Sequence, residues 1–310
     1  MNGRIHYLGP EETFTQQAAL SLKRRGGGTF ELVPAKTLSQ AILRTCEHDG
    51  DFAVLPYYNL HEGLVQETLD LITERQLTVR AAERIPVRFA LGGFHGGSHK
   101  GAPARLPDPS ETAEIFSHPK AIAQCSVYLH SFFPQAEYRE LGSTASAVER
   151  VAETRSGFAI ARCEAFEKRS VPILAENIGN RQYGRTNFTE FLLIGFPDRP
   201  GTTRFPFAAT EPNRTMIAVI PTLDRVGLLA DILGQVAFFG INLLKIHSRP
   251  ALSDHKTEHD PQMFYLEMET RTDSREFRLC RDSLELRLSR SGPSGTEGVV
   301  RVLGEYPLFS

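Results

Sequence analysis

Residues 114–161 read EIFSHPKAIAQCSVYLHSFFPQAEYRELGSTASAVERVAETRSGFAIA, and this stretch decides the fold class. It alternates short strand-like segments at 114–117, 137–141 and 157–161 with amphipathic segments of helical spacing at 119–132 and 144–153. Such alternation is typical of an α/β fold. The pattern extends outward to Ile5–Leu8 and to Phe188–Phe196. We therefore expect one α/β region over residues 1–196.

The C-terminal third follows a different order of segments. Residues 197–213 contain four prolines and little periodicity, which predicts a linker. Beyond it we expect a strand at 215–221, a helix at 225–239, strands at 241–248 and 262–269, a helix at 274–289 and a strand at 299–306. This βαββαβ order predicts a compact ferredoxin-like domain over residues 214–310.

The bulk composition excludes several classes of protein. The 310 residues carry 35 basic and 37 acidic side chains, so no net charge attracts nucleic acid or an anionic membrane. The longest apolar runs, such as Met216–Pro221, are too short to span a bilayer, and a strand-like segment at residue 5 leaves no room for a signal peptide. Cys46, Cys125, Cys163 and Cys280 form no CxxC pair. We expect a cytoplasmic protein without metal or cofactor.

Four polar clusters lie where predicted strands end, which is where open α/β sheets bind their ligands. They are residues 9–15, 56–63, 142–144 and 187–191. Each has an ordinary structural interpretation as a turn, a helix cap, a loop anchor or an edge strand. Taken alone, the clusters indicate an anion-binding α/β pocket with a small regulatory domain.

Several of these segments resemble the prephenate dehydratase family, in the same order along the chain. Residues 7–15 resemble its opening GPxGTF(S/T), with Glu12 where glycine is usual. Residues 118–125 resemble its HPQALxQC segment, residues 143–145 its STA motif, and residues 176–178 the approach to its last catalytic strand. The C-terminal domain resembles the ACT domain of the same family, and the resemblance covers nearly the whole chain.

The resemblance implies a two-lobed catalytic domain similar to a periplasmic binding protein. Lobe one would hold residues 1–75 and 180–196, and lobe two residues 76–179. Family members form dimers or tetramers whose ACT domains bind phenylalanine, so a homodimer or homotetramer and a phenylalanine effector are expected. The implied effector residues are Gly227 and Leu228, at the family's GAL position, with His247 and Arg249, where HSRP replaces ESRP.

Departures from the family fall on its hallmark motifs. Thr-Arg-Phe reads Thr189-Glu190-Phe191, Pro-Ile-Glu-Asn-Ser reads Pro56-Tyr57-Tyr58-Asn59-Leu60, and a usual histidine aligns with Arg88. Glu190 either faces away from the site, as strand alternation predicts, or belongs to a rebuilt pocket. The sequence Tyr57-Tyr58-Asn59, followed by EGLVQE at residues 62–67, resembles the corresponding segment of the prephenate decarboxylases of bacilysin-type pathways.

This second resemblance implies decarboxylation of prephenate without loss of its C4 hydroxyl, giving a dihydro-4-hydroxyphenylpyruvate for an unusual amino acid or antibiotic pathway. The implied catalytic residues are Thr189, Tyr58 and Asn59. The implied substrate-binding residues are Thr13, Tyr57, Arg88, Ser143, Thr144, Asn187 and Phe191. Two alternatives stay open: a prephenate dehydratase that makes phenylpyruvate, which the retained Thr189 favours, and a non-catalytic sensor of an aromatic metabolite.

Overall fold

The computed structural model describes residues 3–27, 29–94, 106, 112–182, 184–197, 211–222, 225–250, 261–289 and 298–310. The chain divides into two compact units. The first unit is Met1–Tyr57, Leu64–Arg84 and Glu190–Ser310, and the second is Tyr58–Gly63 and Ile85–Thr189. Most of the linker predicted at 197–213 lies outside the described residues, and the predicted domain and lobe boundaries stay predictions.

A seven-stranded sheet of order β18-β5-β13-β3-β1-β2, with β4 paired to β3, forms the centre of the first unit. Its strands are β1 (Arg4–Leu8), β2 (Glu31–Ala35), β3 (Phe52–Asn59), β4 (Gly63–Leu64), β5 (Thr78–Pro86), β13 (Phe188–Gly195) and β18 (Leu308–Phe309). Helices α1 (Phe14–Arg25), α2 (Leu38–Thr45) and α3 (Gln66–Glu74) belong to the same unit. β1 runs parallel to both β2 and β3. Ile5, Val54 and Leu192 are fully buried, which explains why their strands are apolar in sequence.

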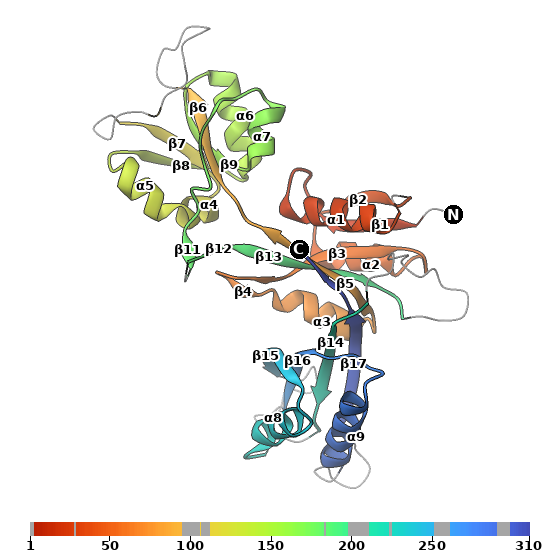
Figure 1. Ribbon diagram of the computed structural model, residues 1–310. Coiled ribbons are helices and arrows are strands. Elements are labelled where there is room, and N and C mark those ends of the chain that lie inside the picture. The colour runs from red at the N-terminus through yellow and green to blue at the C-terminus, as the bar shows by residue number, and fades with distance from the viewer. Residues whose placement is uncertain are drawn as a thin grey trace. The chain divides into compact units, whose positions relative to one another are not determined.

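The second unit is a five-stranded sheet of order β10-β6-β9-β7-β8 (Figure 1). Its strands are β6 (Ala90–Phe94), β7 (Glu114–Ser117), β8 (Glu137–Glu140), β9 (Gly157–Ala161) and β10 (Ile173–Glu176). Its helices are α4 (Pro119–Gln124), α5 (Ser126–Phe132), α6 (Thr144–Thr154) and α7 (Cys163–Lys168), and the short strands β11 (Arg181–Gln182) and β12 (Arg185–Thr186) form a hairpin. The α/β interpretation of residues 114–161 is therefore confirmed.

The prediction of one continuous helix over residues 119–132 is wrong, because the segment forms two helices that meet at Cys125. Asn180 explains the break. Its backbone N–H donates to the Gln124 carbonyl at 2.6 Å, and its side-chain Oδ1 accepts from the Val127 N–H at 3.0 Å. One residue from a distant segment thus satisfies the end of α4 and the start of α5, which a continuous helix would satisfy internally.

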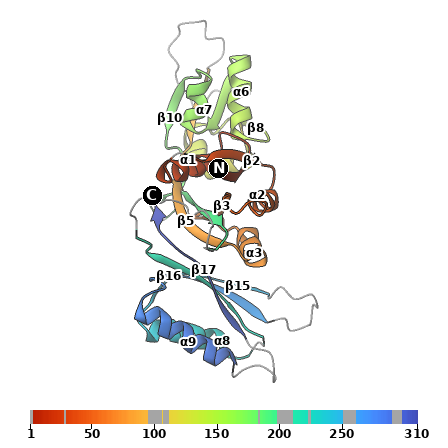
Figure 2. The same ribbon diagram turned by 90° about the vertical axis from the view of Figure 1, so that its right-hand side faces the viewer.

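The C-terminal domain has the predicted βαββαβ order. Its elements are β14 (Arg214–Ile220), α8 (Leu228–Phe238), β15 (Asn242–Pro250), β16 (Gln262–Glu269), α9 (Arg275–Ser289) and β17 (Val299–Tyr306). The antiparallel sheet has the order β15-β16-β14-β17, and both helices lie on one face of it (Figure 2). Ile217, Leu266, Phe277 and Leu284 form part of the core between these layers. The ferredoxin-like topology is confirmed.

The C-terminal domain packs against the main sheet within the first unit. β18 pairs in parallel with β5, with Leu308 opposite Ala82. The Thr78 hydroxyl donates to the Leu303 carbonyl at 2.8 Å. At Gly304 a Cβ atom would lie 2.4 Å from the Val79 carbonyl oxygen, so only glycine permits this approach. Backbone and side-chain contacts therefore join the C-terminal domain to β5.

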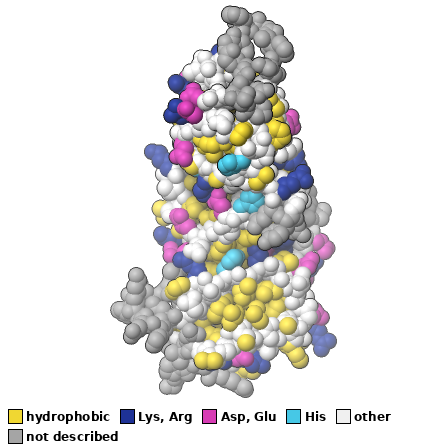
Figure 3. Space-filling model, turned by 90° about the vertical axis from the view of Figure 1, so that its left-hand side faces the viewer, with side chains coloured by type: hydrophobic (Ala, Val, Ile, Leu, Met, Phe, Trp, Pro, Cys, Tyr) yellow, Lys and Arg dark blue, Asp and Glu magenta, His cyan; other side chains and the backbone are white. Residues whose placement is uncertain are grey.

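The described residues include hydrophobic side chains exposed on the surface but no helix suited to span a membrane. None of its described helices is both long and apolar enough to cross a bilayer. Large hydrophobic side chains exposed on the C-terminal domain include Val226, Phe238 and Val299. Figure 3 shows hydrophobic side chains gathered in the lower part of that view, where the C-terminal domain lies.

Candidate active site

The end of β3 and the start of β13 are joined by the side chain of Asn59. Its Nδ2 donates to the Thr189 hydroxyl at 2.9 Å and to the Phe188 carbonyl at 3.2 Å. Its Oδ1 accepts from the N–H groups of His61 at 2.9 Å and Glu62 at 3.0 Å. The amide is thus held in one orientation. Because Thr189 Oγ1 accepts from Asn59 Nδ2, the hydroxyl proton of Thr189 is not used in this bond and is available for donation to another group.

Tyr58 and Asn187 flank this pair in sequence. The Tyr58 ring lies against Phe188, with centroids 6.2 Å apart and planes inclined at 45°. Asn187 is 4% exposed, and its Nδ2 donates to Gln124 Oε1 at 3.1 Å. No described residue donates to the buried Oδ1 of Asn187. Since buried acceptors are nearly always hydrogen-bonded, this oxygen is suited to accept from a ligand hydroxyl or a water molecule.

Residues of the HPKAIAQC segment support the loop that follows Asn59. His118 Nδ1 accepts from the Lys120 N–H at 3.2 Å and caps α4. The Lys120 ammonium donates to Glu62 at 2.8 Å, and Gln124 Nε2 approaches the same carboxylate at 3.4 Å. Gln124 thus contacts both Glu62 and Asn187, a role that the sequence analysis missed although the motif itself was recognised.

A cavity of about 230 Å³ lies within the second unit. Its lining residues are Val87, Arg88, Asn177, Gly179, Asn180, Arg181 and Thr186. Two guanidinium groups line it without any acidic side chain, a set suited to a carboxylate. Arg88 was expected at the site, whereas Arg181 was missed. Over the described part of the chain, no three His, Cys, Asp or Glu side chains are grouped to hold a metal ion.

Ser143 and Thr144 lie at the start of α6. The Ser143 hydroxyl accepts from the Ser146 N–H at 3.0 Å, and the Ser146 side chain in turn accepts from the Ser143 N–H at 3.2 Å. These two bonds form a capping box that satisfies donors of the first helical turn. The hydroxyl of Ser143 is thus engaged within the chain, and its expected substrate contact stays a prediction, as does that of Thr144.

Thr13 caps α1 in the first unit. Its hydroxyl accepts from the Gln16 N–H at 3.3 Å and donates to the Pro10 carbonyl at 3.0 Å. The preceding residue, Glu12, has a φ of +65°, in the left-handed region that favours glycine. Glycine at this point in the family motif therefore has a conformational reason, and Glu12 keeps the conformation without that advantage.

Replacing Glu12 by glycine is expected to stabilise the fold. A side chain in the left-handed region costs roughly 1–2 kcal/mol, and the greater backbone entropy of unfolded glycine cancels roughly 0.5–1 kcal/mol of that gain. We expect a net gain of about 0.5–1 kcal/mol in the free energy of unfolding, measured by urea denaturation. The neighbouring Glu11→Gly, whose backbone lies outside that region, should lower stability; equal effects at both positions would contradict the argument.

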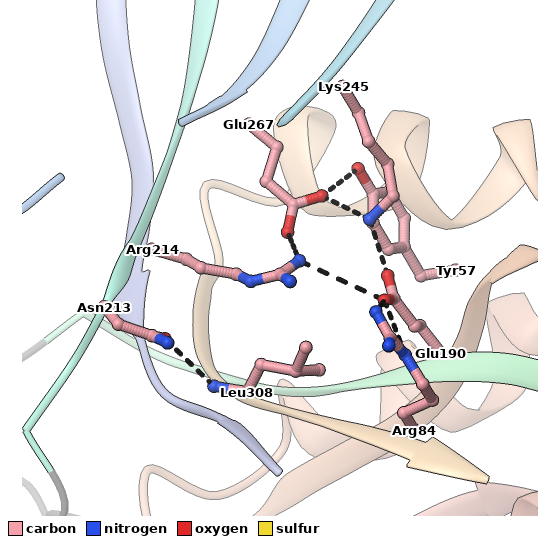
Figure 4. A network of polar contacts seen from close by, with 8 residues as sticks. All are labelled: Tyr57, Arg84, Glu190, Asn213, Arg214, Lys245, Glu267 and Leu308. Carbon is pink, nitrogen blue, oxygen red and sulfur yellow. Dashed lines mark hydrogen bonds and ion pairs between the residues drawn. The ribbon is translucent and has the colours of Figure 1, made fainter. Parts of the chain in front are cut away.

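Tyr57, Glu190 and Phe191 lie in the interior of the first unit. Tyr57 is 2% exposed, and its hydroxyl donates to Glu267 of β16 at 3.2 Å (Figure 4). Phe191 is equally buried. Glu190 pairs with Arg84 at 2.7 Å and with Lys245 at 2.5 Å. Tyr57 is thus engaged with the C-terminal domain and Phe191 is packed in the interior, and their expected substrate contacts stay predictions.

The four expected effector residues lie in the C-terminal domain. Gly227 adopts a φ of +83° before α8, and Leu228 is buried. Burial, together with the charge of Lys245, lowers the pKa of His247. Arg249 pairs with Asp70 at 3.0 Å and donates to Gln66 Oε1 at 3.1 Å, so it binds helix α3 of the same unit. An effector role for these residues stays a prediction.

Known proteins resemble this chain over most of its length. A family model described as prephenate dehydratase matches residues 5–199. A prephenate dehydratase of Amycolatopsis methanolica is 31% identical over 270 residues, which cover 86% of this chain and 79% of that protein. The crystal structure of a prephenate dehydratase from Arthrobacter aurescens in complex with L-Phe is 26% identical, with a TM-score of 0.72, covering 98% of this chain and 90% of that one. A Staphylococcus aureus prephenate dehydratase shares the fold at a TM-score of 0.75 and 22% identity, covering 98% of this chain and 99% of that one.

Proposed function

Because this chain belongs to the prephenate dehydratase family, we propose that it converts prephenate into phenylpyruvate, carbon dioxide and water. The observation that carries the proposal is the hydrogen bond from Asn59 to Thr189, which directs the threonine proton away from the amide. Thr189 is retained from the hallmark motif Thr-Arg-Phe, whose threonine the resemblance to dehydratases makes the proton donor.

The proposed reaction requires protonation of the leaving C4 hydroxyl. As the bond from C1 to its carboxylate breaks, the electron pair moves through the ring diene and expels the C4 oxygen as water. The Thr189 hydroxyl donates to that oxygen, negative charge develops on Oγ1, and a proton from solvent restores the hydroxyl after water has left. The Asn59 N–H, 2.9 Å from Oγ1, stabilises this charge.

The substrate is a dianion, and the cavity that contains Arg88 and Arg181 is proposed to bind one of its carboxylates. Replacing either arginine by alanine is expected to raise KM for prephenate about tenfold or more, because a charge-assisted hydrogen bond contributes about 1.5–3 kcal/mol. Steady-state kinetics would check this. Arg139, which pairs with Glu114 and Glu137 in the same unit, offers an exposed control whose replacement should leave KM unchanged. An unchanged KM in both cavity variants would remove this assignment.

A second candidate is decarboxylation without dehydration, the first expectation from the sequence. One observation favours it. Tyr58 stands where the family has a carboxylic acid, and its ring packs on Phe188 next to Thr189. An aromatic wall of this kind excludes water and removes one acid from the site. The C4 hydroxyl would then survive, and a ring carbon would be protonated after carbon dioxide leaves.

Product analysis separates the candidates. Purified protein is incubated with prephenate at neutral pH, and the products are identified by NMR. Phenylpyruvate in excess over the uncatalysed background supports dehydratase activity. A non-aromatic dihydro-4-hydroxyphenylpyruvate would replace the first candidate with the second, and prephenate unchanged beyond the background would leave the sensor interpretation.

Regulation and assembly complete the proposal. The βαββαβ domain is proposed to be an ACT domain that binds phenylalanine, supported by the Arthrobacter aurescens relative, whose structure is a complex with L-Phe. Calorimetric titration with phenylalanine tests this. A homodimer or homotetramer is proposed as well, supported by the exposed hydrophobic side chains Val226 and Phe238. A cytoplasmic location also stays a proposal.

A further inference from the structure

Six side chains form a polar cluster where the C-terminal domain meets β13, and we call it the junction cluster (Figure 4). Its members are Tyr57, Arg84, Glu190, Arg214, Lys245 and Glu267. Two carboxylates, each with a side chain 1% exposed, are matched by three cationic groups. The reversed charge in the family's Thr-Arg-Phe motif therefore has its partners in this cluster.

Lys245 of β15 holds the two carboxylates together. Its ammonium lies 2.5 Å from Glu190 and 2.6 Å from Glu267, and 5.0 Å from the centre of the Tyr57 ring. Arg214 completes the set, 2.5 Å from the other oxygen of Glu267. Burial would raise the pKa of Glu267, but the charges of Lys245 and Arg214 outweigh burial and lower it. The cluster is thus strongly paired, and Lys245 is the group that links β15 to β13.

Glu190 follows Thr189 directly in β13. Successive side chains of a strand point to opposite faces, so Thr189 and Glu190 project from opposite sides of the same backbone. Fixing the Glu190 carboxylate by two short ion pairs fixes the peptide that carries Thr189. A shift of β15 that moves Lys245 would move this peptide as well.

The same edge of β15 makes a second link to the catalytic region. Arg249, four residues beyond Lys245 and therefore on the same face of the strand, pairs with Asp70 of α3 at 3.0 Å. β15 is thus attached to both α3 and β13 by side chains from one face. A displacement of β15 would therefore move Lys245 and, through the ion pair with Glu190, the backbone that carries Thr189.

We propose that Lys245 and Glu190 are positioning residues that set the proton-donating geometry of Thr189 and let the C-terminal domain control turnover. The proposal rests on the proposed function, because Thr189 is taken as the proton donor. In this proposal, the glutamate at position 190 serves communication between the C-terminal domain and the catalytic region. The Lys245–Glu190 ion pair is then expected to control kcat rather than substrate binding.

The test is a double-mutant cycle on the full chain with Lys245→Met, Glu190→Gln and both together. Each single variant is expected to lower kcat about tenfold with KM changed less than twofold, and the double variant to be no slower than the single ones. The double variant also removes one charge of each sign, so it keeps the test possible if a single variant unfolds. Arg271→Met serves as control, because Arg271 belongs to an exposed ion pair of the same domain.

Hydrogen exchange of a peptide covering Phe188–Gly195 gives a readout independent of activity. Faster exchange is expected in both single variants and not in Arg271→Met. If wild-type protein does not turn over prephenate, the proposed function fails while the exchange measurement still tests the link. Unchanged kcat and exchange in the single variants would overturn the proposal, as would independent losses that multiply in the double variant.

Discussion

Replacing Thr189 by valine is expected to lower kcat for prephenate about a thousandfold, because a positioned proton donor contributes roughly 10²–10⁴ to a rate. Valine keeps the shape of threonine and removes only the hydroxyl. Asn59 retains its bond to the Phe188 carbonyl and its two bonds from the following loop, so the local backbone should persist. The decrease in prephenate concentration, followed under saturating conditions, measures kcat.

Two further variants separate chemistry from structure. Thr189→Ser keeps the donor and should retain far more activity than Thr189→Val. Asn59→Ala removes the bond that stabilises Oγ1 and should lower kcat by about 10²-fold, as for other donors to a developing oxyanion. If Thr189→Val keeps wild-type kcat, another group donates the proton and the Asn59–Thr189 pair is structural.

The secondary structure could be predicted well, because the hydrophobic pattern of each segment depends on its own buried side chains. The alternation over residues 114–161 reports which side chains are buried in each strand and helix, and the structure has β7, β8 and β9 there with α4, α5 and α6. The βαββαβ order was predicted from the same kind of pattern, and the structure confirms it. The break at Cys125 escaped prediction, because its cause, Asn180, lies outside the segment.

In the candidate site, too, residues in motifs could be predicted, whereas their partners from distant segments could not. Asn59 and Thr189 were predicted as catalytic residues from motifs, and the structure brings their side chains to 2.9 Å. The partners of Tyr57 and Glu190 could not be predicted, because they come from β5, β15 and β16, more than fifty residues away in sequence. A charge change in a motif reveals nothing about which face of the strand its partners occupy until the pairing is known.

This placement changes how the departures from the family bear on function. Tyr57 and Glu190 face the C-terminal domain, so they carry no argument about the fate of the C4 hydroxyl. Tyr58 and Arg88 remain among the departures as candidates for contact with the substrate. That is why dehydration, with Thr189 as donor, is the better-supported chemistry, and why Tyr58 is the residue on which the alternative depends.

Restoring the family's arginine with Glu190→Arg is expected to lower the free energy of unfolding by about 3–5 kcal/mol. The new guanidinium would lie among Arg84, Arg214 and Lys245, with Glu267 as the one carboxylate left in the junction cluster. Burying an uncompensated charge costs more than removing one, so Glu190→Gln should lose clearly less. Because folded proteins have only about 5–15 kcal/mol of stability, the arginine variant should be barely folded at 37 °C.

Urea denaturation of Glu190→Arg, Glu190→Gln and the double variant Glu190→Arg/Lys245→Met measures these differences. The double variant removes the cation closest to residue 190 and should recover part of the loss. The argument depends on residue 190 being enclosed by cations, so a Glu190→Arg protein as stable as wild type would refute the burial of this side chain. Equal losses for arginine and glutamine would instead show that the hydrogen bonds of Glu190, rather than its charge, stabilise the junction.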